Sequence, residues 1–141
     1  MKVADILKSK GTFVYSLTAN ASVFDALKMM AEKNIGALMI IEEEKLLGIF
    51  SERDYARKIV LQGKASHDTH VNEIMTKTVI TVQSVDSLEQ CMELMSKNKI
   101  RHLPVVDNDK VAGIISIGDV VMAIIETQKE TITHLQNYIA Q

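Results

Sequence analysis

The chain has 141 residues, of which 47% are hydrophobic and 24% are charged, and its net charge is −2. This balance is typical of a globular protein of one compact domain or two small halves, and it excludes the basic field that recruits nucleic acid or anionic membranes. The longest apolar runs are too short to span a bilayer. A single cysteine excludes an internal disulfide, so we expect a cytoplasmic protein.

The first part of the chain alternates between strand and helix patterns. A short strand at 14–17 precedes a helix that follows the predicted N-cap Ser22. Two apolar runs, at 37–41 and 46–50, flank an acidic turn and predict a hairpin. A final helix is predicted to begin at Ser51.

The same order returns further along the chain. A strand at 79–82 precedes a helix that follows Ser87, the first residue of a capping-box pattern. Apolar runs at 103–106 and 111–115 predict a second hairpin, and Ser116 opens the last helix. We expect that helix to continue to the C-terminus with an apolar face, which predicts a homodimer.

The two parts are copies of one unit. A shift of 65 residues aligns 22–60 with 87–125 and gives ten identities in 39 positions. Upstream, 3–7 matches 71–75 at a spacing of 68, so the first copy carries three extra residues near 8–12. Because about 60 residues bury only a thin core, we expect the copies to pack on each other. The predicted units are repeat 1 at 1–66, repeat 2 at 67–126 and a helical extension at 127–141.

The strongest match between the copies is Gly-Ile-x-Ser-x-x-Asp, which ends at Asp54 and at Asp119. If Ser51 caps a helix, its hydroxyl lies beside free backbone N–H groups that favour an anion. Asp54 could accept hydrogen bonds from vicinal hydroxyls, as acidic residues do for ribose. Positive charge follows at Arg53, Arg57 and Lys58, so the set suits a ribose phosphate. The alternative is that the serine and the aspartate form a capping pair and nothing more.

A second basic site precedes the later hairpin. Arg101 and His102 stand where the first copy has Gly36 and Ala37. Arginine is the preferred bidentate partner of phosphate, whereas the alternative is a solvated arginine and a half-buried histidine. Pro104 cannot donate a ladder hydrogen bond, so its strand lies at an edge or borders a cleft.

Other candidate groups favour structural roles. Cys91 lies on the apolar face of a helix, which predicts a buried thiol. Four methionines at helical spacing, Met29, Met30, Met92 and Met95, are predicted to fill the core. The spacing of His67 and His70 does not match a structural zinc site, so a solvated linker is expected there.

The duplicated motif, the Ile-x-x-Leu strand before each copy and the 65-residue spacing resemble a pair of CBS domains from Val3 to about Glu126. The resemblance implies an α+β fold of tandem β-α-β-β-α repeats, packed with pseudo-two-fold symmetry, plus the helical extension. It also implies a stand-alone regulatory module for signal transduction and energy sensing, which binds adenine nucleotides in clefts between the repeats.

The resemblance also assigns roles to individual residues. It implies that Asp54 and Asp119 hold ribose hydroxyls, that Ser51 and Ser116 contact ribose or phosphate, and that Arg101 and His102 reach phosphates. The second copy has apolar residues or glycine where the first has its positive charges, which predicts unequal phosphate affinity. The base is expected against Val14, Tyr15, Ile35, Gly36, Ala37 and Leu38 of the first copy and Val79, Ile80, Ile100 and Pro104 of the second.

The ligand and partners follow from the same resemblance. AMP ranks first, with ADP, ATP and NAD as alternatives, and the basic residues rank S-adenosylmethionine lower. No metal is required, and no nucleophile–base pair or Gly-rich phosphate loop suggests an enzyme. The expected partners are a second CBS pair and an unknown regulated protein. The alternatives are a dimerisation scaffold with vestigial clefts or, with less support, a nucleotide-metabolising enzyme.

Overall fold

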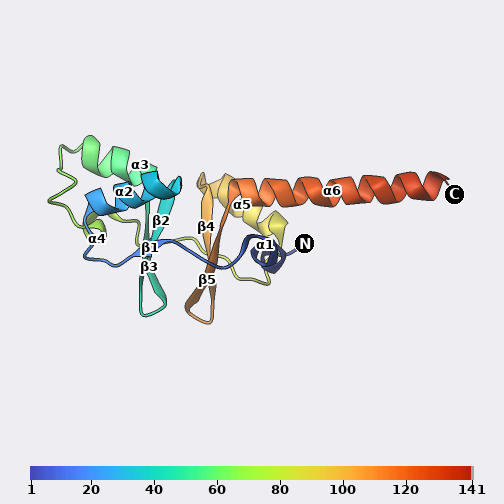
Figure 1. Cartoon of the computed structure of the whole chain (residues 1–141), viewed down its shortest axis with the longest axis horizontal. Coiled ribbons are helices and arrows are strands. Elements are labelled where there is room, and N and C mark those ends of the chain that lie inside the picture. Colours follow the sequence, from blue (N-terminus) through green and yellow to red (C-terminus); the bar gives the residue numbers. More distant parts are fainter. Residues whose placement is uncertain (141) are drawn as a thin grey trace.

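Two β-hairpins form the framework of the computed structural model, which describes residues 1–140 (Figure 1). β2 (Ala37–Glu42) pairs antiparallel with β3 (Lys45–Ser51), and β4 (His102–Asp107) pairs in the same way with β5 (Lys110–Ser116). The two central residues of each turn have positive φ, as two-residue hairpin turns require. β3 and β5 contact each other, so the hairpins lie side by side and join the halves.

One helix packs on each hairpin, and its start was correctly predicted. Ser22 Oγ accepts the Asp25 N–H at 3.0 Å at the start of α2 (Val23–Lys33). Ser87 Oγ accepts the Gln90 N–H at 3.2 Å at the start of α5 (Leu88–Asn98). These caps satisfy backbone donors that the first helical turn leaves free.

The first strand differs between the halves. β1 (Ser16–Leu17) pairs parallel with β2, whereas the strand predicted at 79–82 shrinks to one bridge between Val82 and Val105. Val82 N–H donates to the Pro104 carbonyl at 3.0 Å. Pro104 has no N–H to return on that edge, so the ladder stops there, as the edge prediction for this residue anticipated.

Each half is completed by a helix that precedes the other repeat. α1 (Val3–Lys10) buries Val3, Ile6 and Leu7 in the core that contains α5 and β5. α4 (Val71–Ile74) lies instead in the core around α2 and β3. The backbone contacts are equivalent: Val3 N–H donates to Asp86 O at 2.9 Å, and Val71 N–H donates to Ala21 O at 2.8 Å.

The motif glycines allow these crossing segments to come close. A Cβ at Gly48 would lie 2.6 Å from Met75 Sδ and 2.9 Å from the Thr76 carbonyl oxygen. A Cβ at Gly113 would lie 2.7 Å from Leu7 Cδ2. The glycine of the repeated motif therefore has a packing role in both copies.

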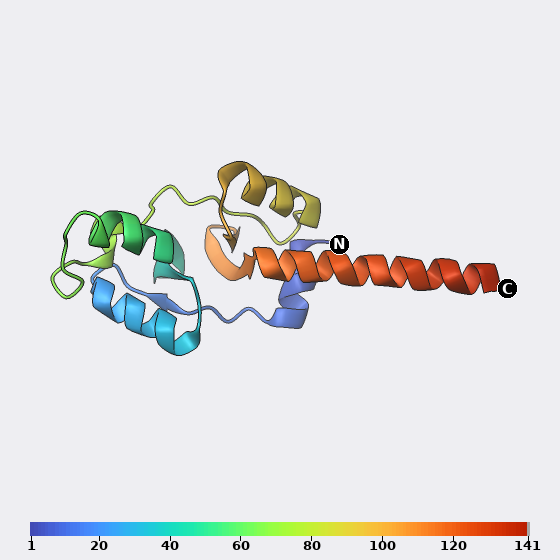
Figure 2. The same cartoon turned by 90° about the horizontal axis from the view of Figure 1, so that it is seen from above.

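The two final helices differ in form and length. In the first half, α3 (Glu52–Asp54) continues into the π-helical segment η1 (Tyr55–Val60). In the second half, α6 (Ile117–Ala140) leaves the body and extends far beyond it, confirming the predicted C-terminal helix (Figures 1 and 2). Within residues 1–140, no helix is both long and apolar enough to cross a membrane.

We predict that Gly48→Ala lowers the free energy of unfolding by about 1–3 kcal/mol, because the new methyl group meets backbone as well as side chain. Gly113→Ala should cost less, since the flexible Leu7 side chain can move. Gly118→Ala, with its nearest contact at 3.6 Å, is the control and should be neutral or slightly stabilising. Urea unfolding measures all three, and equal losses for Gly48→Ala and the control would contradict the packing role.

Candidate functional site

A cavity of about 510 Å³ opens between the halves at the first motif. Ser51, Arg53 and Asp54 reach it from the end of β3 and from α3, beside Gly36 and Ala37. The second repeat contributes the opposite wall. Its lining residues are Thr76, Thr78, Val79, Ile80, Asn98, Ile100, Arg101 and His102. The structure therefore brings together predicted phosphate, ribose and base residues from both copies.

The cavity has basic groups on both walls. Arg53 belongs to the first half, whereas Arg101 and His102 belong to the second. Burial lowers the pKa of His102, and the nearby charges of Lys10 and Arg101 lower it further, although Asp119 and Glu52 oppose them. His102 is thus a neutral hydrogen-bonding group near pH 7, and the two arginines supply the fixed positive charge.

Gly36 lies at the cavity between the His102 ring and the Glu52 carboxyl group. A Cβ at Gly36 would lie 3.7 Å from His102 Cε1 and 3.9 Å from the Glu52 carboxyl group. The Gly36 carbonyl also accepts the Glu52 N–H at 3.1 Å, which fixes the start of α3. A side chain at this position would fill space between the two walls.

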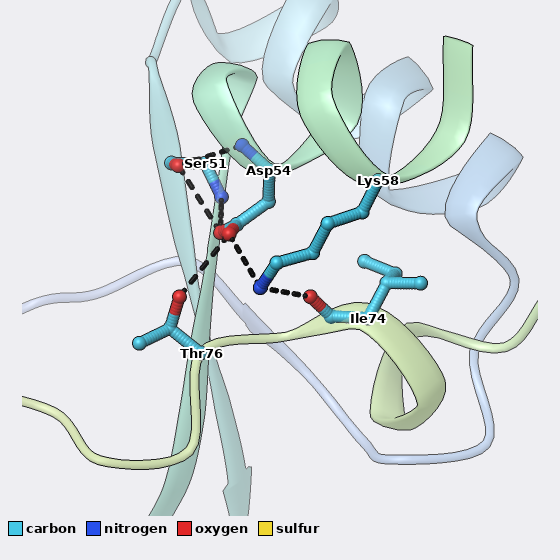
Figure 3. Close-up of polar contacts among 5 residues, drawn as sticks. All are labelled: Ser51, Asp54, Lys58, Ile74 and Thr76. Atoms are coloured by element: carbon cyan, nitrogen blue, oxygen red, sulfur yellow. Dashed lines mark hydrogen bonds and ion pairs between the residues drawn. The ribbon is translucent and has the colours of Figure 1, made fainter. Parts of the chain in front are cut away.

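Asp54 is almost fully buried and has four hydrogen-bond or ionic partners (Figure 3). Oδ2 accepts Ser51 N–H at 3.0 Å and Ser51 Oγ–H at 3.1 Å. Oδ1 accepts Thr76 Oγ1–H at 3.1 Å and pairs with Lys58 Nζ at 3.0 Å. Lys58 also donates to the Ile74 carbonyl at 2.9 Å, so it ties η1 to the end of α4.

The motif aspartates are capping residues in both copies. Asp54 N–H donates back to Ser51 Oγ at 3.3 Å, and Asp119 N–H donates to Ser116 Oγ at 3.1 Å. The capping pair weighed as the alternative interpretation is therefore present. A ribose at Asp54 would exchange with the Thr76 or Lys58 donor, because a carboxylate has about four acceptor sites.

Asp119 has a different cationic partner. Lys10 Nζ, at the end of α1, lies 2.7 Å from Asp119 Oδ2 and donates to the Ile114 carbonyl at 2.9 Å. Burial raises the pKa of Asp119, but the hydrogen bond and charge of Lys10 and the Ser116 N–H outweigh it and leave the pKa below its usual range. The second motif thus obtains its positive charge from the N-terminal helix.

The remaining predicted residues lie outside this cavity. Arg57 is exposed, and Lys58 is engaged with Asp54. Tyr15 and Ile35 pack against the first core, and Leu38 is completely buried in it. The others away from this cavity are Val14, Pro104, Ser116 and Asp119. Their roles in ligand binding stay predictions.

The sequence did not identify several groups of these two sites. Lys10 lies in the segment 8–12 that contains the three extra residues, outside the aligned parts of the repeat. Thr76 lies in a linking segment, and only its bridge to Ile49 brings it to Asp54. Glu52, Thr78 and Asn98 also line the cavity. Of these three, only Thr78 had a signal in the sequence, because it directly precedes the predicted base residue Val79.

Cys91 is a buried thiol, as predicted. Burial raises its pKa to about 11, and the charges of Asp86 and Glu89 add to the effect, so the thiolate is suppressed near pH 7. Among residues 1–140, no group of three or more His, Cys, Asp or Glu side chains could hold a metal ion.

Comparison with known proteins establishes the class of protein that this fold and motif define. The CBS domain model matches residues 3–61 and 71–126, so the chain belongs to the CBS domain family. The chain is 40% identical to the mitochondrial CBS domain-containing protein CBSX3 of Arabidopsis thaliana, over 97% of this chain and 71% of the relative.

Solved structures agree with this assignment. A CBS-domain protein of Burkholderia ambifaria MC40-6 is 48% identical, with a TM-score of 0.85, and the match covers 91% of this chain and 96% of that one. The CBS domain pair of protein MJ0100, solved with 5′-methylthioadenosine and S-adenosyl-L-methionine, is 32% identical with a TM-score of 0.78, and the match covers 90% and 98%. The tandem α+β fold implied by the resemblance to CBS domains is confirmed.

We predict that the Lys10–Asp119 pair stabilises the fold in a pH-dependent way. The folded pKa of Asp119 is depressed, so this stability is present above the ordinary carboxyl pKa of 3.8 and is lost as pH falls through the lower folded value. Lys10→Met should therefore lower the unfolding free energy at pH 7, by about 1 kcal/mol or less for such a solvent-accessible pair. The difference in unfolding free energy between the unchanged chain and Lys10→Met should become smaller in acid.

Lys8→Met, at an exposed position of the same helix, is the matched control and should leave the pH profile unchanged. Denaturant unfolding between pH 2.5 and 7 compares the two variants. If the loss of unfolding free energy caused by Lys10→Met stayed constant over this pH range, an ionic contribution of the Lys10–Asp119 pair to stability would be excluded.

Proposed function

We propose that this CBS pair is a regulatory module that senses an adenine nucleotide bound in the cavity at the first motif. The observation that carries the proposal is the meeting of Arg53 and Arg101, from opposite halves, on one cavity next to Asp54. Two arginines can bind phosphate oxygens bidentately, and the aspartate and serine suit a ribose. Val79, Ile80 and Ile100 offer apolar surface for the base.

The ligand that suits this cavity best is a phosphorylated adenosine. The related pair of MJ0100 was solved with two adenosyl compounds, which supports adenosine as the common element. Those compounds carry no phosphate, whereas this cavity has fixed positive charge on both walls. We therefore rank AMP first, followed by ADP, ATP and NAD, with no metal needed to hold them.

Signalling would follow from the position of the cavity between the halves. A nucleotide that contacts both walls favours the arrangement in which the walls have the right separation. It can shift a partner only through different affinity for two arrangements. The regulated partner would be a separate protein or domain that reads this difference, and the CBS pair itself would act as a homodimer.

A regulatory role fits the side chains of the cavity better than an enzymatic one. The neutral His102 could accept a proton, but the motif serine is engaged with Asp54 as a helix cap. A nucleophile needs a base within hydrogen-bond reach to become reactive. For location we keep the cytoplasm as the proposal, while the Arabidopsis relative is named as mitochondrial.

We predict that AMP, ADP, ATP or NAD raises the melting temperature, because a ligand of the folded state stabilises it by mass action. Arg53→Gln and Arg101→Gln should each weaken AMP binding about tenfold, the loss expected for one charge-assisted hydrogen bond. Neither change should affect 5′-methylthioadenosine, which has no phosphate. Calorimetry with both ligands on each variant measures the difference.

Arg57→Gln is the matched control, because Arg57 is exposed and lies outside the cavity lining. Equal weakening by all three arginine changes would point to general electrostatics. No melting shift with any adenosine compound would support the alternative of vestigial clefts, and turnover of a nucleotide would support an enzyme.

We also predict that a motif aspartate reads the ribose. Asp54→Asn should weaken AMP binding in the cavity at the first motif, because an amide cannot accept from two hydroxyls as a carboxylate does. Asp119 lies outside that cavity, so Asp119→Asn should weaken binding only at the second motif. The exposed turn residue Asp109, changed to Asn, serves as control. If the Asp54→Asn, Asp119→Asn double variant kept full affinity in calorimetry, the ribose assignment would fail.

A further inference from the structure

A stripe of apolar side chains runs along the face of α6 that the rest of the chain leaves uncovered. These side chains are between 39% and 81% exposed: Val121, Ile125, Ile132, Leu135 and Ile139. The adjacent face buries Val120 and Ala123 in the second core, with Ile124 packed against it. The body therefore already occupies one side of α6, and the stripe needs a different partner.

The stripe follows a heptad repeat. Ile125, Ile132 and Ile139 are seven residues apart and take position a, while Val121, Gln128 and Leu135 take position d. Alternating steps of three and four residues make the narrow seam of a two-stranded coiled coil, whereas a helix lying on a globular core shows a wider apolar face.

The end of α6 has little support from its own chain. Thr127 still contacts Met1, whereas the C-terminal part of α6 projects away from both halves in both views (Figures 1 and 2). Isolated helices of fewer than about 12–15 residues are marginal in water. The projecting segment therefore needs a partner along its seam, and that partner must itself extend beyond the body.

We infer that the partner is α6 of a second copy of this chain, in a parallel two-stranded coiled coil. The inference rests on the homodimer proposed above and names the surface that forms it. A second copy supplies a projecting helix of the same length with the same seam, so each isoleucine at a meets its equivalent. Isoleucine at a with leucine at d, as at Leu135, favours two parallel strands.

The charges beside the seam support pairing of identical helices. The flanking e and g positions of the heptads are Met122, Lys129, Gln136, Ile124, Thr131 and Tyr138, so one charged residue stands among them. Helices that select a different partner do so with complementary e and g charges. In a parallel pair, e faces g, so Lys129 does not meet its own copy.

Gln128 fixes the register and the direction of the pair. In a parallel in-register dimer it lies opposite the second Gln128, and the two amides can hydrogen-bond to each other. In an antiparallel pair, position d faces position a, which would set Gln128 against an isoleucine. One polar residue in the seam specifies register in this way at some cost in stability.

The test is the mass of the full chain in solution. Sedimentation equilibrium should give twice the chain mass of 15.7 kDa. Ile132→Glu with Leu135→Glu should raise the dimer dissociation constant at least about 100-fold, because each carboxylate would be buried without a partner. Thr133→Glu with Asn137→Glu adds the same charge away from the seam and should stay dimeric. Circular dichroism and unfolding check that the halves of each variant remain folded.

A cross-link tests the direction of the helices. Leu135→Cys should form a disulfide between two copies on oxidation, because facing d positions in a parallel pair approach closely, whereas Thr133→Cys on the outer face should not. Cys91 is completely buried and does not compete.

Three outcomes would overturn the inference. A seam variant that dimerises as tightly as its control would reject α6 as the interface while leaving the homodimer in place. A full chain that stays monomeric would reject the homodimer as well. Failure of Leu135→Cys to cross-link would reject the parallel pair. Nucleotide binding is measured separately, so its failure would be distinguishable from all three.

Discussion

The exchange of helices between the repeats is the constraint on which the rest of the structure depends. α1 completes the core of the second half, and α4 completes the core of the first. Separating the halves would open both cores, so they hold a fixed cavity between them. The motif glycines, Gly48 and Gly113, are the points where the crossing segments touch the hairpins. These close contacts explain why glycine recurs at this motif position: the position is constrained by packing.

The same crossings give the two motif aspartates their different surroundings. The segment after α4 brings Thr76 to Asp54, and the end of α1 brings Lys10 to Asp119. In the first half the cation on the aspartate is Lys58, one turn along the same helix. The fold is symmetrical, but its polar chemistry is not. The sequence comparison placed the local positive charge correctly in the first copy, yet it left the second copy without the cation that α1 supplies.

The position of the cavity between the repeats is what the proposed regulatory role depends on. Its walls come from different repeats, and an arginine stands on each. A ligand bound as proposed would therefore contact both halves. α6 begins at the second motif, directly after Ser116, so the long helix is attached to the second half.

The sequence by itself determined the tandem hairpins, the helix caps at Ser22 and Ser87, and the two-fold repetition, because each depends on local periodicity, capping chemistry and identities at one spacing. The sequence also predicted most of the polar residues that line the first cavity. Tertiary structure alone decided which repeat each linking helix completes, which cation reaches Asp119 and how far the second half keeps its first strand. Those outcomes depend on contacts between residues far apart in the sequence, such as Val71 with Ala21 and Lys10 with Asp119, or on a missing N–H at Pro104. No local pattern encodes the distance between such groups.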